Sequence, residues 1–259
     1  MSMDFAVVVP WHRKEVMEAF RHAWDIPDRE PDWLIMQHDA DGDGCAVTKN
    51  RGIDRALVRG AQVVVVLDDD CYPTDEAPRL EVLARKHIEL LDTPAEVRMF
   101  TPVTAPWSRG TPYANLTTPM PVAASMGYWT EVGDYCAARQ LVHQNAPMDF
   151  MRGTVFGRYF PLCGMNLAFR PDRWWPWWQF INVDRFDDIW QGWLWQKRAY
   201  HEGYCFNLGG PLVRHSRQSN VWANLRAEAE HLEANEHLWE TIFQHSSVEY
   251  EPLRALLPV

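Results

Sequence analysis

The sequence predicts an α/β fold with a mixed, mainly parallel sheet flanked by helices. Continuous apolar runs rich in β-branched residues, at 5–9 and 63–67, are typical of strands buried on both faces of a sheet. Helical patterns alternate with such runs along the first hundred residues, as in α/β proteins. Hydrophobic residues make up 47% and charged residues 23% of the 259, close to the globular average, which excludes disorder as the main state.

The first half of the chain alternates strand and helix in order. The run 5–9 ends at a proline, and the run 63–67 ends at three consecutive aspartates. Between and after these runs, apolar residues recur at helical spacing. We expect strands at 5–9, 33–36, 63–67 and 97–101, and helices at 47–58 and 80–91.

The second half is less regular. Residues 102–121 are rich in Pro, Thr, Gly and Ala and predict a loop, whereas the apolar segment 162–169 predicts a strand. A helix is expected at 187–201. Apolar residues recur at helical spacing through 222–243, which predicts one amphipathic C-terminal helix. No linker-like stretch divides the chain, so we expect a single domain over 1–259.

Charge and cysteine content restrict the partners and the compartment. The 25 basic and 35 acidic residues give a net charge of −10, which disfavours binding along a phosphate backbone. Five scattered cysteines fit neither a disulfide scaffold nor a zinc module and favour a reducing compartment. No apolar stretch approaches the roughly 20 residues of a membrane span. The run 5–10 has charged neighbours in the wrong order for a signal peptide. We therefore expect a cytoplasmic protein without a membrane span.

Three carboxylates follow the most apolar predicted strand. Asp68, Asp69 and Asp70 stand directly after Leu67. Adjacent carboxylates at the end of a buried strand repel one another, and a hard divalent cation such as Mn²⁺ or Mg²⁺ would neutralise them through oxygen ligands. The strand end is also where ligands bind in open α/β sheets. The alternative is a solvated acidic turn that caps the next helix.

Two further polar clusters are candidates for chemistry. Asp187 and Asp188 begin a predicted helix, where the helix dipole alone favours them, but they would also serve as a general base or orient a sugar hydroxyl. The run 214–220 contains two arginines, a histidine and two serines, a set suited to a diphosphate. His215 could add a nitrogen ligand to a metal. A solvated loop is the competing interpretation for this run.

Two apolar segments contain unusual residues. Gly164 and Asn166 interrupt the run 161–169, which suggests close approach of a ligand or of another strand. Four tryptophans within residues 174–178 cannot all be buried at such spacing. They indicate a stacking platform for a sugar or base ring, a cover for another element, or a contact between subunits of an oligomer.

Together these stretches resemble one family, the reversibly glycosylated polypeptides, also called UDP-arabinopyranose mutases, within the GT-A glycosyltransferase fold. The resemblance extends from Asp4 to about Phe243. It is carried by the opening strand and by five motifs: DDDC at 68–71, RGTPY at 109–113, CGMNLAF at 163–169, RFDDIWQGW at 185–193 and HSRQSNVWANL at 215–225.

The resemblance implies a GT-A domain, Rossmann-like, of the nucleotide-diphospho-sugar transferase type. Residues 1–100 would form its nucleotide-binding half, 101–221 its sugar or acceptor half, and 222–245 its C-terminal helix. It also implies a UDP-sugar substrate, Mn²⁺ or Mg²⁺ as cofactor, interconversion of pyranose and furanose rings, and reversible glycosylation of Arg109. We assign metal binding to Asp68, Asp70 and His215, catalysis to Asp187, Asp188 and Arg109, and UDP-sugar contacts to Pro10, Asp39, Arg51, Asp68, Asp69, Asn166, Ser216 and Arg217.

Two departures from the plant members leave alternatives open. Leu116 stands where those proteins commonly have a second arginine, and they lack the tryptophan-rich insert at 174–178. The first alternative is a glycosyltransferase that moves a sugar from a UDP-sugar to an external acceptor, either a glycan or a hydroxylated nucleobase in DNA. The second is a non-catalytic scaffold that binds a UDP-sugar.

Overall fold

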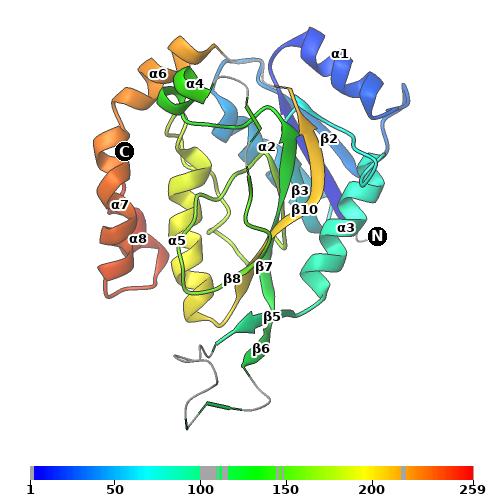
Figure 1. The fold of residues 1–259 in the computed structure, drawn as a ribbon. Helices are drawn as coiled ribbons and strands as arrows, with labels where there is room; N and C mark the ends of the chain where they lie inside the picture. The colour runs from blue at the N-terminus through cyan, green and yellow to red at the C-terminus, as the bar shows by residue number, and fades with distance from the viewer. Residues whose placement is uncertain are drawn as a thin grey trace.

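An eight-stranded sheet forms the centre of the molecule (Figure 1). The computed structural model describes residues 3–99, 109, 111–112, 116–143, 146–147, 149–216 and 220–258. Its strands are ordered β2-β1-β3-β9-β7-β10-β4, and β8 pairs with β10. They are β1 (Met3–Trp11), β2 (Leu34–His38), β3 (Ala61–Leu67), β4 (Cys71–Tyr72), β7 (Val122–Glu131), β8 (Gly153–Val155), β9 (Asn166–Phe169) and β10 (Cys205–His215).

The strand directions confirm the mixed, mainly parallel sheet. β1 is parallel to β2 and β3, and β10 is parallel to β7. β9 lies between the two groups and is antiparallel to both β3 and β7. All five of the longer strands therefore run in one direction, and their carboxyl ends meet at one edge of the sheet.

Helices cover both faces of this sheet, as expected (Figure 1). α1 (Lys14–Ala23) and α3 (Leu80–Asp92) lie on one face, and α2 (Cys45–Val58) and α5 (Asp187–His201) lie on the other. None of the helices in the described part of the chain combines the length and apolarity needed to cross a membrane. The remaining helices are α4 (Ala137–His143), α6 (Val221–Ala229), α7 (Leu232–Gln244) and α8 (Tyr250–Arg254).

The prediction of one C-terminal helix over 222–243 is wrong. The segment forms α6 and α7, which are separated at Glu230 and His231. α6 packs on α4, whereas α7 packs on α5. The two helices of this segment therefore pack against different parts of the protein. The apolar stripe that suggested one helix does not face one core, because Trp222 at its start is 57% exposed.

Several elements were not predicted from the sequence. β7 is rich in small residues, and β10 is interrupted by glycines and a proline, so neither shows a strong strand pattern. The expected loop 102–121 contains β6 (Thr117–Met120), which pairs antiparallel with β5 (Ala95–Arg98). Both of these strands lie outside the main sheet and project below it in Figure 1.

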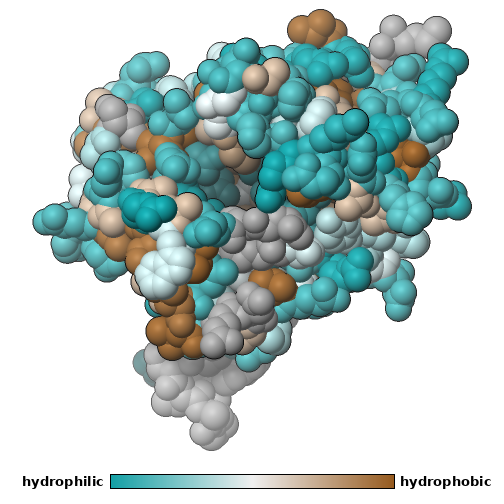
Figure 2. Space-filling view, turned by 90° about the horizontal axis from the view of Figure 1, so that it is seen from above, coloured by the Kyte–Doolittle hydropathy of each residue, from teal (hydrophilic) through white to brown (hydrophobic). Residues whose placement is uncertain are grey.

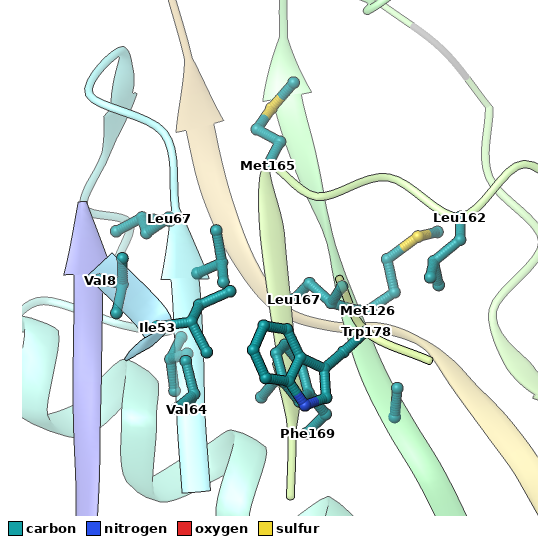
Figure 3. Close-up of a cluster of buried hydrophobic side chains, with 14 of the residues drawn as sticks. Val8, Ile53, Val64, Leu67, Met126, Leu162, Met165, Leu167, Phe169 and Trp178 are labelled. Carbon is teal, nitrogen blue, oxygen red and sulfur yellow. The ribbon is translucent and has the colours of Figure 1, made fainter. Parts of the chain in front are cut away.

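Aromatic rings pack in the core on the α5 side of the sheet, and Figure 3 shows two of them, Phe169 and Trp178, among aliphatic side chains. The ring of Phe169 on β9 stacks on Trp178 with centroids 5.7 Å apart and meets the edge of Trp195 on α5 at 5.5 Å. Val64 and Leu167 contribute to the same cluster. Truncation of a buried Trp or Phe side chain to Ala costs about 3–5 kcal/mol, so this cluster anchors β9 against the middle of α5.

The tryptophan-rich segment belongs mostly to this core. Trp174, Trp177 and Trp178 are buried, and only Trp175 is largely exposed, at 56%. None of the four lines the cavity described below. The expectation of a tryptophan platform beside the ligand site is therefore wrong for these residues. The reason is that the chain turns tightly here, which directs three of the rings inward.

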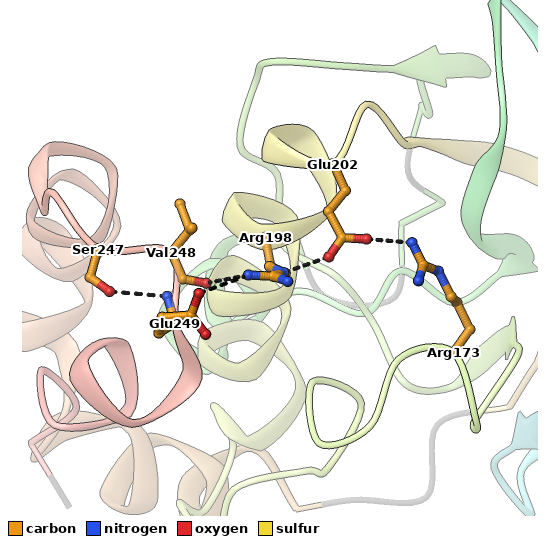
Figure 4. A network of polar contacts seen from close by, with 6 residues as sticks. All are labelled: Arg173, Arg198, Glu202, Ser247, Val248 and Glu249. Carbon is orange, nitrogen blue, oxygen red and sulfur yellow. Dashed lines mark hydrogen bonds and ion pairs between the residues drawn. The ribbon is translucent and has the colours of Figure 1, made fainter.

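A chain of ion pairs fixes the C-terminal segment to α5 (Figure 4). Arg198 on α5 donates from Nε to Glu202 at 2.6 Å and from Nη1 to Glu249 at 3.2 Å, and Glu202 also accepts from Arg173. These groups are at least partly exposed, so each pair contributes little stability individually. Their arrangement still orients the segment before α8 against α5.

Candidate active site

A cavity of about 1070 Å³ opens at the carboxyl ends of the parallel strands. Figure 2 looks onto this end of the molecule, where the surface is hollowed and hydrophilic side chains surround the hollow. One part of the cavity is lined by the charged residues Lys49, Asp68, Asp70, Asp187, Asp188 and His215. Another part is lined by the aromatic residues Tyr128, Trp129, Phe150, Phe156, Tyr159 and Phe160. The cavity thus joins a polar floor to an apolar wall.

The three aspartates form a turn between β3 and β4. The N–H of Asp68 donates to the carbonyl of Met165 at 3.0 Å, and the N–H of Cys71 donates back to the Asp68 carbonyl at 3.1 Å. Asp68 and Asp70 line the cavity, but Asp69 does not. Burial, then Asp70 and Asp68, raise the pKa of Asp69 to about 7. Carboxylates held this close repel one another, which favours the binding of either a proton or a cation.

Strand pairing brings His215 to this turn. β4 pairs antiparallel with β10, so His215 lies opposite Cys71, and the N–H of Ser216 donates to the Asp70 carbonyl at 3.0 Å. His215 Nδ1 donates to the carbonyl of Val132 at 2.9 Å, which leaves Nε2 facing Asp70 Oδ2 at 3.5 Å. Burial opposes protonation of His215, but Asp70 outweighs it and raises the pKa of the imidazole. Asp70 and His215, predicted as metal ligands from separate motifs, therefore meet.

The donor chemistry of this pair fits a divalent cation. An imidazole whose Nδ1–H is fixed by a carbonyl presents its other nitrogen as a ligand, and a carboxylate oxygen converges on the same point. Asp68 differs, because its Oδ1 lies 2.9 Å from Lys49 Nζ instead. Within the described ranges no three His, Cys, Asp or Glu side chains are gathered as a ready metal site. Asp70 and His215 would hold the ion, with further ligands supplied by substrate.

The two aspartates of the DDIW motif face the same cavity. They begin α5 as predicted, and both are half-buried. Asp188 Oδ2 accepts the backbone N–H of Gly164 at 2.7 Å. Burial and then the charge of Asp188 raise the pKa of Asp187, and burial raises that of Asp188. Two neighbouring carboxyl groups that resist ionisation form a pair able to give and to take a proton.

Lys49 was not among the predicted residues. It lies on α2, its side chain is only 4% exposed, and it lines the cavity floor beside Asp68. The sequence carried a signal for it, since Lys49 shares the inward face of α2 with Ala46, Ile53 and Ala56. A lysine within an apolar helical face is unusual and indicates a buried partner.

Arg185 and Glu228 were also missed. Glu228 on α6 is 2% exposed, accepts from Arg185 Nε at 3.1 Å, and accepts from the N–H of Ala137 at 2.7 Å. Arg185 has a left-handed backbone, with φ of 67°, directly before α5. Both residues line the cavity. The buried carboxylate therefore joins the starts of α4 and α5 to α6 and closes one wall.

The residues assigned to UDP-sugar contacts are more scattered. Pro10 is buried in β1, and Asp39 accepts the N–H groups of Asp43 and Gly44 at 2.9 and 3.1 Å. Arg51 lies 2.6 Å from Asp43. None of Pro10, Asp39 and Arg51 lines the cavity, although Asp43 and Gly44 do. Asp39 shapes this part of the rim through its hydrogen bonds to the backbone.

Asn166 faces away from the cavity. It is fully buried, its Nδ2 donates to the Pro211 carbonyl at 2.9 Å, and its Oδ1 lies 2.9 Å from His87 Nε2. The assignment of Asn166 to nucleotide binding is therefore corrected to a role in fastening β9 to β10 and α3. Its neighbour in the sequence, Met165, lines the cavity instead.

The remaining assigned residues are not among the described residues that line the cavity. Ser216 follows β10 and is half-buried, and Arg217 lies outside the described residues. Arg109 is exposed and is not among the described residues that line the cavity. Most of the segment around Arg109, namely 100–108, 110 and 113–115, also lies outside the described residues.

Comparison with known proteins gives one consistent result. The model of the family described as "Reversibly glycosylated polypeptide" matches residues 55–251. Pea (Pisum sativum) probable UDP-arabinopyranose mutase 1 is 31% identical over 188 residues, and Arabidopsis thaliana UDP-arabinopyranose mutase 3 is 30% identical over 193 residues. Each match covers 66% of this chain and 52% of the relative. The chain thus spans about half the length of the curated relatives it matches.

A solved structure is also similar over most of the chain. It is a mannosyltransferase from Pyrobaculum calidifontis in complex with GDP-Man and Mn²⁺. The TM-score is 0.47 at 14% sequence identity, and the match covers 99% of this chain and 69% of the mannosyltransferase.

Proposed function

Because the chain belongs to the reversibly glycosylated polypeptide family, we propose that it interconverts the pyranose and furanose forms of a UDP-sugar. One observation carries this proposal: the adjacent carboxyl groups of Asp187 and Asp188 line the same cavity as Asp70 and His215. The diphosphate of the nucleotide would lie at Asp70 and His215, and the sugar would lie toward Asp187 and Asp188.

The reaction requires a balanced movement of protons. As the bond between the anomeric carbon and UDP breaks, the hydroxyl that closes the new ring must bond to that carbon and lose its proton. The old ring oxygen must then leave the carbon and gain a proton as UDP adds back. Asp187 and Asp188 suit both transfers, because burial keeps their affinity for a proton high. The pair ends the cycle in the protonation state in which it began.

Departing UDP must be held until it adds back to the sugar. We assign a Mn²⁺ or Mg²⁺ ion to Asp70 and His215, and such an ion stabilises the charge that develops on the diphosphate. Aromatic residues around the cavity, Tyr128 and Trp129 among them, would limit the access of water, which would otherwise hydrolyse the sugar. By its resemblance to the family, Arg109 is the residue that we propose to be reversibly glycosylated.

Transfer to an external acceptor is the second candidate function. The size of the cavity favours it, since about 1070 Å³ reaches the upper end of the range for small-molecule sites, about 300–1,000 Å³. A glycan or a hydroxylated nucleobase would then occupy the aromatic part of the cavity. In that case the carboxyl pair would act on the acceptor hydroxyl.

Product analysis tests the proposal. The protein is incubated with UDP-arabinopyranose and Mn²⁺ without an acceptor, and the nucleotide sugars are separated. Appearance of UDP-arabinofuranose is the expected result. Recovery of unchanged substrate, with consumption only after an acceptor is added, would support transfer instead. Loss of the furanose product in Arg109→Ala, with UDP binding retained, would assign the sugar-carrying step to Arg109.

A further inference from the structure

Arg185 lies at the wall of the cavity, two residues before α5. Its side chain is 28% exposed, and it lines the same cavity as Asp187 and Asp188. Its Nε donates to Glu228 Oε1 at 3.1 Å, and the side chain of Glu228 is only 3% exposed. A guanidinium that is fixed through Nε still presents Nη1 and Nη2 as a planar fork of donors.

The two terminal nitrogens of Arg185 have no protein acceptor. Among the residues that the structure describes, the ion pair of Arg185 is with Glu228 alone, and its side-chain hydrogen bond uses Nε. Donors at the wall of a cavity bond to water in the free protein, and a ligand oxygen can take the place of that water. The position of the fork therefore points to a ligand oxygen inside the cavity.

The backbone conformation of Arg185 also favours a role for its side chain. The φ angle is 67°, in the left-handed region where residues other than glycine are uncommon. Glycine adopts this conformation without the steric cost, so an arginine here reduces stability unless its side chain is used. Backbone strain of this kind is found preferentially at ligand sites. Arg185 thus combines a strained backbone with a side chain that faces both Glu228 and the cavity.

The charges around Arg185 indicate the kind of ligand oxygen. Burial opposes the charge of the guanidinium, but three carboxylates outweigh it and raise the pKa, namely those of Asp134, Glu228 and Asp188. An anionic ligand group would be repelled by these carboxylates. A hydroxyl accepts from the guanidinium and can donate to a carboxylate, so it suits both kinds of neighbour.

We propose that Arg185 binds the sugar of the UDP-sugar, by donating from Nη1 and Nη2 to hydroxyl oxygens of a neutral ring. This inference rests on the proposed function, in which the sugar lies toward the carboxyl pair at the start of α5. It adds a binding residue for the sugar, whereas Asp70 and His215 are assigned to the diphosphate. A purely structural Arg185 would support the wall through Glu228 and would not distinguish UDP from a UDP-sugar.

Binding of UDP and of an uncleavable UDP-sugar separates these roles. The second ligand is UDP-arabinopyranose with a methylene group in place of the oxygen between the sugar and the diphosphate. Both dissociation constants are measured by calorimetry with Mn²⁺. We expect Arg185→Lys, which keeps the charge but lacks the fork, to bind the analogue about tenfold less tightly and UDP equally well, since hydrogen bonds from charged groups are the stronger ones. Arg173→Lys is the matched control, because Arg173 also pairs with a glutamate, Glu202, but does not line the cavity.

A third ligand tests the preference for a neutral sugar. The corresponding analogue of UDP-galacturonic acid adds a carboxylate to a ring with the same arrangement of hydroxyl groups. We expect the wild type to bind it less tightly than the arabinopyranose analogue. Tighter binding that is lost in Arg185→Lys would show that Arg185 binds a carboxylate, and would overturn the proposal.

The remaining outcomes are equally decisive. If Arg185→Lys binds UDP and the arabinopyranose analogue with equal losses of affinity, or with no loss for either, Arg185 does not contact the sugar. If Arg185→Lys does not fold, Arg185→Gln keeps a donor beside Glu228, and the same criterion applies to it. Failure of the proposed function gives a different result: UDP-arabinofuranose is not formed, although binding of the analogue still depends on Arg185.

Discussion

The backbone N–H of Gly164 donates to Asp188 Oδ2 at 2.7 Å. This bond joins the loop before β9 to the first turn of α5, and so connects two motifs that are more than twenty residues apart in the sequence. The close packing of Phe180 explains why a glycine stands at position 164. A side-chain carbon there would lie 2.6 Å from Cε1 of Phe180, closer than real contacts allow.

Gly164→Ala should therefore disturb the carboxyl pair. Either Phe180 or the loop must move, and movement of the loop displaces Asp188. We expect turnover to fall at least tenfold and the free energy of unfolding to fall by about 1–3 kcal/mol, the usual cost of overpacking. The double variant Gly164→Ala/Phe180→Leu, which removes the clash, should recover part of both. Equal turnover in Gly164→Ala and wild type would argue against positioning by this bond.

Removing either carboxyl group tests the proton transfers. Asp187→Asn and Asp188→Asn keep the shape of the side chain but cannot exchange a proton. We expect at least one to lower turnover by about 10²–10⁴, the range for a positioned acid or base. UDP affinity, measured by calorimetry, should change little. If both variants remain fully active, the pair has no role in catalysis.

Removing the metal ligands should affect binding. Asp70→Ala and His215→Ala each delete one side of the pair separated by 3.5 Å. We expect UDP binding that requires Mn²⁺ in the wild type and is lost in Asp70→Ala or after addition of a chelator. His215→Ala, which deletes the nitrogen ligand, should weaken it at least as much as the loss of a group that only orients a ligand, roughly 10–100-fold. Binding that is equally tight with chelator present would contradict a metal at this position.

The buried Arg185–Glu228 pair should support the cavity wall. Glu228→Ala leaves the guanidinium of Arg185 and the N–H of Ala137 without this acceptor. Breaking a buried pair from one side costs roughly 3–5 kcal/mol. Thermal unfolding should show a clear loss of stability, whereas Glu236→Ala on the exposed side of α7 should show almost none. Similar melting temperatures for the two variants would mean that Glu228 carries no such role.

His87 should make the protein less stable in mild acid. It is fully buried between Ser125 and Asn166, and burial lowers its pKa to about 4, although the bond to Asn166 opposes this shift. The unfolded chain takes up the proton near pH 6.5, whereas the folded chain does not until about pH 4. Stability should therefore decrease as pH falls through this window, by on the order of 3 kcal/mol in full.

Urea unfolding at pH 7, 6 and 5 measures this contribution. Because other groups titrate in the same window, the wild-type slope is compared with that of His87→Gln, which cannot take up the proton. His237→Gln, at an exposed position on α7, is the control. We expect a flatter pH dependence only in His87→Gln. Parallel slopes for all three proteins would contradict a neutral, buried His87.

The sequence predicted the regular parts of the fold well. β1, β3, α2, α3 and α5 carry strong periodic or apolar patterns, and they form where expected. β7 and β10 were missed, because small residues in β7 and the glycines and proline in β10 hide the strand pattern. Their pairing depends on contacts between distant segments, which local propensity does not encode.

In the candidate site, too, some residues could be predicted from local sequence patterns and others could not. The motifs of Asp70 and His215 predicted that the two residues belong to one site, and the structure brings them to 3.5 Å; a metal between them stays a prediction. Asn166 was misassigned, because its sequence neighbours do not reveal that it faces His87 on the opposite side of β9. Lys49 was missed although its place on the apolar face of α2 was a signal, whereas Glu228 is recognisable only once its partner Arg185 is known.

A mutase reaction in this cavity requires that the bond between the anomeric carbon and UDP breaks and forms again before either fragment leaves. Positional isotope exchange tests it most directly. A UDP-arabinopyranose labelled with ¹⁸O in the bridging oxygen between the sugar and the β-phosphate is incubated with the protein and Mn²⁺, without an acceptor. We predict that the label moves into the non-bridging oxygens of the β-phosphate, and that this movement slows in the affected Asp187 or Asp188 variant. Label that stays in the bridge, with UDP released only after an acceptor is added, would contradict a mutase and indicate transfer.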